Sequence, residues 1–161
     1  MHRVGQFVAH VRARVSPEQD AFAARLLPPG AARLFADMPI ADRRHGLEVA
    51  QRLLAAGFDD PELLAAALVH DAGKGRRMRL WHRVAAVMVD AVAPRLLARI
   101  ASSDPASAGY PFHLYLHHGP LSADAALAAG CSARSAAFIR GSASGADARL
   151  AAALHAADDA S

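Results

Sequence analysis

The stretch ALVHDAGKG, from Ala67 to Gly75, ends an apolar run with a histidine and an aspartate side by side, His70 and Asp71. Adjacent side chains on an α-helix are about 100° apart, so both can flank one small object at a helix end without sharing a face. Imidazole and carboxylate groups together suit ions such as iron, manganese, zinc or magnesium. We therefore predict that this run is a helix ending in two ligands of a divalent metal ion.

The basic residue of this stretch, Lys74, is the only lysine in the chain, because the other seventeen basic residues are arginines. Gly73 before it would allow the chain to turn sharply. An ammonium group is a compact charge that can hold a phosphate oxygen beside a metal ion. We therefore predict that Lys74 contacts a phosphate group. A third ligand, His45, can come from the preceding helix if that helix lies across a groove from His70.

Alanine makes up about a quarter of the 161 residues, and no segment alternates between apolar and polar residues. Alanine is the strongest helix former, and a chain of this length fits one domain. The sequence therefore predicts an all-α, single-domain bundle. We expect helices over 17–27, 31–37, 41–56, 61–69, 78–101 with a kink at Pro94, 112–117, 122–129, 132–140 and 145–159, and a loop over 102–111.

The charge pattern and the single cysteine limit the partners that we expect. The net charge is +3, and the longest basic cluster is only Arg76, Arg77 and Arg79, so we do not expect nucleic-acid binding. One cysteine, Cys131, excludes an intrachain disulfide and fits a reducing compartment. Arginines interrupt the N-terminal apolar residues, and no apolar run approaches the roughly 18 residues of a membrane span. We expect a cytoplasmic protein without a membrane partner, whose oligomeric state is open.

Four segments together resemble the HD-domain superfamily of metal-dependent phosphohydrolases. They are RRHGLEVAQRLL (43–54), DDPELLAAALVHDAGKG (59–75), LHHGPLSADAALAAG (116–130) and AALHAADD (152–159). The resemblance runs from about Asp42 to Asp159. It implies an HD-type helical bundle over residues 41–161, with residues 1–40 as an N-terminal helical segment packed on this domain.

The resemblance also implies a metal site. Asp158 matches the terminal aspartate of the family best, with Asp159 as the alternative, and His118 matches a further histidine in His-Gly-Pro. The most similar pattern is that of bacterial HD hydrolases of dinucleoside tetraphosphates, which bind two metal ions. Ser142, in FIRGSA (138–143), stands where those enzymes have another histidine, and a hydroxyl is a poor ligand for such ions. We therefore expect one ion rather than two, with iron, manganese, zinc, nickel and magnesium all open. The implied metal ligands are His45, His70, Asp71, His118 and Asp158.

The function that the resemblance implies is hydrolysis of a phosphoester or phosphoanhydride in a small, nucleotide-like substrate by a metal-activated water. Asp71 and Lys74 are the expected catalytic residues, because Asp71 can orient or deprotonate the water. The expected phosphate-binding residues are Lys74, Arg44, Arg77 and His82. The alternative is a degenerate HD domain that binds a metal ion or a nucleotide without turnover, which Ser142 favours.

Overall fold

Helix starts in this chain are set by local capping. Ser16 accepts a hydrogen bond from the Gln19 N–H, and the Gln19 side chain accepts one from the Ser16 N–H, which together cap helix α2 (Pro17–Leu26). The Asp60 carboxylate accepts from the N–H groups of Glu62 and Leu63 at the start of α5 (Pro61–Val69). These caps satisfy backbone donors that a helix end leaves without partners. The predicted starts of both helices are confirmed.

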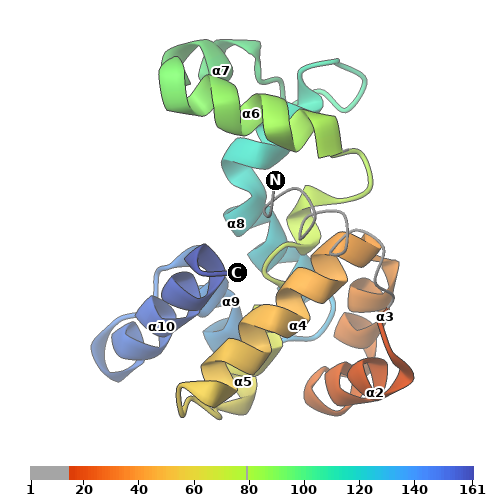
Figure 1. Cartoon of the computed structure of the whole chain (residues 1–161), viewed down its shortest axis with the longest axis vertical. Coiled ribbons are helices and arrows are strands. Elements are labelled where there is room, and N and C mark those ends of the chain that lie inside the picture. Colours follow the sequence, from red (N-terminus) through yellow and green to blue (C-terminus); the bar gives the residue numbers. More distant parts are fainter. Residues whose placement is uncertain (1–14, 79) are drawn as a thin grey trace, which may run out of the picture.

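The computed structural model describes residues 15–78 and 80–161 (Figure 1). The first fourteen residues, part of the predicted segment 1–40, lie outside this range. The described residues form an all-α single domain of nine α-helices and two short 3₁₀ turns, without a strand. The remaining elements are α3 (Pro29–Asp37), α4 (Ile40–Ala55), η1 (Ala72–Lys74), α6 (Leu80–Val92), α7 (Pro94–Ile100), α8 (Tyr110–Ala128), α9 (Ala133–Arg140), η2 (Gly145–Asp147) and α10 (Ala148–Asp159).

Helix α5 is the centre of the core. All seven residues from Leu63 to Val69 are buried, and α2, α3, α4, α8, α9 and α10 pack around this helix. Full burial of a leucine or valine side chain contributes about 1.5–3 kcal/mol. The apolar run before His70 is therefore the main core element, and this burial fixes the position of the His70–Asp71 pair that follows it.

Two glycines allow the helices around the site to approach closely. A Cβ atom at Gly46 would lie 2.7 Å from the Leu68 carbonyl oxygen, so α4 can pack on α5 only because this residue has no side chain. A Cβ atom at Gly73 would lie 2.6 Å from the Ser122 nitrogen and 2.8 Å from the His118 oxygen of α8. The expected turn is present, because Gly73 is the middle residue of the 3₁₀ turn η1, and the positive φ of 58° follows at Gly75.

Two predicted helix boundaries are wrong. The helix predicted over 78–101 is two helices, α6 and α7, because Ala93 has φ −150° and ψ 62°. A residue before proline is disfavoured in the α region, and Pro94 begins α7. Conversely, the two helices predicted over 112–117 and 122–129 are the single helix α8, which runs through Pro120. An interior proline costs about 3 kcal/mol, and the packing of α8 on η1 and α9 offsets this cost.

Helices α6 and α7 form the end of the molecule at the top of Figure 1, where they pack on each other and on α8. The other helices lie around α5 in the lower part of this view. Among the described residues, no helix combines the length and the apolar character needed to cross a membrane.

Candidate metal centre

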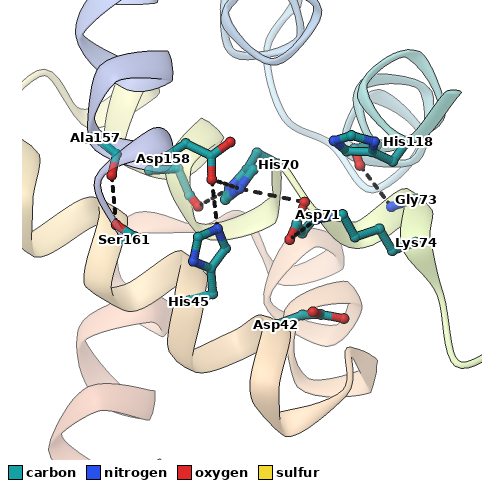
Figure 2. A network of polar contacts seen from close by, with 12 residues as sticks. Asp42, His45, His70, Asp71, Gly73, Lys74, His118, Ala157, Asp158 and Ser161 are labelled. Carbon is teal, nitrogen blue, oxygen red and sulfur yellow. Dashed lines mark hydrogen bonds and ion pairs between the residues drawn. The ribbon is translucent and has the colours of Figure 1, made fainter. Parts of the chain in front are cut away.

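Three side chains from distant parts of the sequence meet at one end of α5. His45 comes from α4, His70 follows α5, and Asp158 comes from the last turn of α10, and Figure 2 shows them pointing toward one another. The His45 Nε2 atom lies 2.7 Å from Asp158 Oδ1, and His70 Nε2 lies 3.3 Å from the same oxygen. The centroids of the two imidazole rings are 5.1 Å apart. The predicted convergence of these three residues is therefore confirmed.

The spacing of these donor atoms suits one metal ion. One ligand atom from each of His45, His70 and Asp158 lies within 4.8 Å of the other two. An ion with bonds of about 2.0–2.2 Å to nitrogen and oxygen holds neighbouring ligand atoms roughly 3 to 4 Å apart. A possible metal site formed by two histidines and one aspartate is thus present in the fold.

The hydrogen bonding of His70 leaves its ligand atom available. Its Nδ1 atom lies 2.8 Å from the Ala67 carbonyl oxygen, which can only accept, so Nδ1 carries the proton. In neutral imidazole the Nε2 atom then carries the lone pair, and a metal-binding histidine is usually oriented by such a bond. The side chain is buried, and Nε2 faces the carboxylate oxygens of Asp158, at 3.3 Å, and of Asp71, at 3.6 Å.

Asp71 lies beside this cluster and has one paired and one unpaired oxygen. Its Oδ2 accepts a hydrogen bond of 2.6 Å from Lys74 Nζ. Its Oδ1 is buried, lies 3.6 Å from His70 Nε2 and has no hydrogen-bond partner among the described residues. Asp71 is not one of the three clustered residues, although the sequence predicts it as a metal ligand. Lys74 therefore holds Asp71 so that its Oδ1 faces His70.

The charges of this group depend on one another. Burial alone would raise the pKa of Asp71, but His70 and the Lys74 ammonium outweigh burial and hold it below its ordinary value. Burial would also raise the pKa of Asp158, but His45 and His70 hold it well below its ordinary range. Burial alone would lower the pKa of His70, and the carboxylates of Asp158 and Asp71 raise it instead. The site therefore holds two carboxylates in their ionised form.

A pocket of about 230 Å³ opens beside His70 and Asp158. His118 lines this pocket, and its Nδ1 atom lies 2.8 Å from the Tyr115 carbonyl oxygen, so its Nε2 carries the lone pair when the ring is neutral. Burial, together with the nearby Lys74, lowers the pKa of His118 and favours this neutral form. His118 lies outside the cluster of three ligands but on the same pocket.

Two further residues of this pocket were not predicted as site residues. Arg140, at the end of α9, and His155, on α10, line the pocket together with His70 and Asp158. The Arg140 guanidinium also forms an ion pair with Asp124. The sequence contained one indication of Arg140. It lies two residues before Ser142, in the FIRGSA segment that is compared with the family pattern.

A buried ion pair supports the start of α4, one turn before His45. The Asp42 carboxylate is buried and accepts hydrogen bonds of 2.5 Å and 2.6 Å from the two terminal nitrogens of Arg83. Burial alone would lower the pKa of Arg83, and Asp42 outweighs it and raises the pKa. This bidentate pair joins α4 to α6 and was not predicted from the sequence.

The other predicted phosphate-binding residues, Arg44, Arg77 and His82, are not among those that line the pocket beside His70. Arg77 donates a hydrogen bond to the Pro105 carbonyl oxygen, and with His82 it lines a different pocket of about 460 Å³. His82 is buried, and its ring lies 3.6 Å from that of Trp81 between centroids, at a tilt of 32°. One terminal nitrogen of Arg44 is buried without a hydrogen-bond partner among the described residues. Ser142 is exposed and is not among the residues that line the pocket beside His70.

Comparisons of the chain with protein families, with curated proteins and with solved structures find no match. The resemblance to the HD-domain superfamily therefore stays a prediction that rests on the sequence motifs, and the description of the site rests on its geometry.

Proposed function

We propose that this chain is a phosphohydrolase that uses one divalent metal ion held by His45, His70 and Asp158. The observation that carries the proposal is the convergence of one ligand atom from each of His45, His70 and Asp158 within 4.8 Å. Beside them, the buried Asp71 Oδ1 has no hydrogen-bond partner among the described residues. Leaving such an oxygen unpaired costs about 1–3 kcal/mol. A hydrated cation at the three ligands would provide Asp71 Oδ1 with a partner, which supports the proposal.

A divalent ion in this position would polarise a phosphoryl oxygen and lower the pKa of its water from 15.7 to roughly 7 to 9. The protein supplies the remaining parts. The bond from His70 Nδ1 to the Ala67 oxygen orients the imidazole, and Lys74 keeps Asp71 ionised. Asp71 Oδ1 can then accept a proton from the attacking water or hold that water in line with the phosphorus atom.

The pocket supports a phosphoryl group as the bound part of the substrate. Its volume of about 230 Å³ is below the roughly 300–1,000 Å³ of sites that enclose a whole small ligand. Arg140 lines the pocket, and its guanidinium, which is paired with Asp124, would bind phosphate oxygens in a bidentate manner once it turns from that carboxylate. Lys74 is not among the residues that line the pocket; one of its three donors bonds Asp71, and the other two would contact a phosphate that extends toward Asp71. The rest of the substrate would extend outside the pocket.

Hydrolysis of a panel of phosphoesters and dinucleotides by the manganese- or iron-loaded protein tests this proposal. We expect turnover that stops with a chelator and falls at least about 100-fold in Asp71→Asn. Asp59→Asn is the matched control, because Asp59 is exposed and lies outside the site. Metal binding without any turnover that depends on Asp71 would refute the enzymatic part of the proposal.

The second candidate function is a binding module that holds a metal ion or a nucleotide without hydrolysis. The exposed Ser142, which stands in place of a ligand in the family pattern, favours this alternative. The two candidates differ in one measurement, the affinity for a nucleotide with and without chelator, followed by analysis of the bound compound. Tight binding of an intact nucleotide would favour the binding module.

A further inference from the structure

The outward face of α6 and α7 is strongly apolar. Of the large apolar side chains that are exposed among the described residues, most lie on this helix pair, and the five most exposed are all there. Val92 is 83% exposed and Met88 is 65% exposed. We call this surface the α6–α7 ridge, and its residues are Trp81, Val84, Val87, Met88, Val92, Leu96 and Ile100.

The inner face of the same helix pair buries much less apolar surface. Among the described side chains of α6 and α7, the buried apolar ones are Ala86 and Leu97, and neither belongs to the main core around α5. A helix at the surface of a monomer normally shows the opposite pattern, with its apolar side facing the core. The apolar side chains of α6 and α7 are therefore distributed as in a helix layer that is covered on both sides. One side of this layer packs on α8 (Figure 1).

The size of the ridge matches a protein–protein interface. From their exposed fractions, the seven side chains expose on the order of 600 Å². The largest apolar patch on a typical monomer is about 300–600 Å², and each partner of a standard interface contributes about 800 Å². With a rim of neighbouring atoms, the ridge reaches the area that a stable dimer needs.

The charges around the ridge favour a second protein surface over a lipid surface. Between Val84 and Val92 the sequence contains no basic residue, and its one charged residue, Asp90, accepts a hydrogen bond from the Tyr115 hydroxyl. Helices that lie on anionic membranes carry lysine or arginine along the edges of the apolar face. The exposed arginines near the ridge lie at its two ends, Arg76 and Arg77 beside Trp81 and Arg95 and Arg99 on α7, and not along its middle.

We propose that the α6–α7 ridge is the interface of a homodimer, in which it packs on the same ridge of a second copy of this chain. A two-fold axis makes such an interface self-complementary, so one apolar ridge suffices for both partners. In an antiparallel arrangement, the small residues Ala85 and Ala91 allow the two α6 helices to approach closely, and Trp81 of one copy packs beside Val92 of the other. The inference is independent of the proposed hydrolase activity.

Sedimentation velocity of the full chain across micromolar concentrations tests the proposal. We expect the wild type to sediment with twice the chain mass of 16.9 kDa. Met88→Glu and Val92→Glu should each weaken the dimer at least about tenfold, because either would bury carboxylates in the apolar interface. Both positions are exposed in the monomer, so the helical circular dichroism should not change. Leu127→Glu, on exposed α8 surface, is the control and should leave the dimer intact.

Two outcomes would overturn the proposal, a monomer, for which two further measurements identify what covers the ridge, and a dimer that uses another face. A wild type that stays monomeric at all concentrations excludes the dimer. If that monomer binds vesicles of anionic lipid and Met88→Glu does not, the ridge contacts a membrane surface. If the monomer is destabilised by Met88→Glu, a segment of the same chain covers the ridge. A dimer that is unaffected by both ridge substitutions would use another face.

Discussion

His45 and Asp158 are 113 residues apart in the chain, and their side chains are joined by a contact of 2.7 Å between Nε2 and Oδ1. The same carboxylate oxygen lies 3.3 Å from His70 Nε2, so one aspartate links α4, the end of α5 and α10. Without a metal ion this carboxylate contacts both imidazoles. With one, the three donor atoms would turn to the cation, and the helix ends would keep their positions.

The first prediction concerns pH. The pKa of His70 is raised in the fold, so its proton stabilises the folded chain fully below the unfolded pKa of about 6.5. That stabilisation is lost as the pH rises through the higher folded value. The free energy of unfolding of the metal-free chain should therefore fall from pH 6.5 upward. Denaturant titrations with chelator measure it, and His70→Gln should remove this part of the slope. Equal slopes in both proteins would contradict the assignment.

The second prediction concerns the close approach of Gly73 to α8. Gly73→Ala would place a Cβ atom 2.6 Å from the Ser122 nitrogen and so push η1 away from α8. We expect a loss of about 1–3 kcal/mol in the free energy of unfolding. Gly119→Ala, within α8, is the matched control, because its Cβ would have 3.7 Å to the nearest atom. The control should be neutral or stabilise the protein by up to about 1 kcal/mol. Equal effects of the two substitutions would exclude the proposed contact.

The buried ion pair gives the third prediction. Asp42→Ala would leave Arg83 without its bidentate partner, and Arg83 is about a quarter exposed, so solvent screens part of the loss. We expect a destabilisation of about 2–3 kcal/mol, below the 3–5 kcal/mol of a fully buried pair. Asp20→Ala breaks the exposed ion pair with Arg43 and should cost at most about 1 kcal/mol. Chemical denaturation of both variants measures the difference, and a similar cost for both would show that burial of Asp42 does not matter.

The fourth prediction concerns the predicted phosphate contacts. Arg140 lines the pocket beside His70, whereas Arg77 lies in another pocket, bonded to the Pro105 oxygen. If the protein hydrolyses phosphoesters, Arg140→Gln should raise KM at least about tenfold, because a charge-assisted bond to phosphate contributes about 1.5–3 kcal/mol. Arg77→Gln should change KM by less than threefold for a small phosphoester. If a steady-state assay shows a larger rise in KM for Arg77→Gln than for Arg140→Gln, the phosphate binds in the Arg77 pocket instead.

The sequence predicted the all-α fold because apolar runs and alanine content are local signals that survive in the fold, and the resemblance to the HD-domain superfamily implied the meeting of His45, His70 and Asp158. It could not predict that α8 continues through Pro120, since the packing of that helix on η1 and α9 is not visible in the sequence. Asp42 and Arg83 are 41 residues apart in the chain, and nothing in the sequence near either residue indicates its partner. Arg140 was missed for the same reason, since only the fold places it beside His70.

The metal content of the folded protein tests the central claim most directly. Elemental analysis after dialysis against a limiting concentration of manganese or iron should give one ion per wild-type chain. The affinity should fall at least about 100-fold in Asp158→Asn, which loses a charged ligand, and stay unchanged in Asp159→Asn, its exposed neighbour. A wild type without bound metal, or equal metal content in both variants, would contradict a cation site at His45, His70 and Asp158.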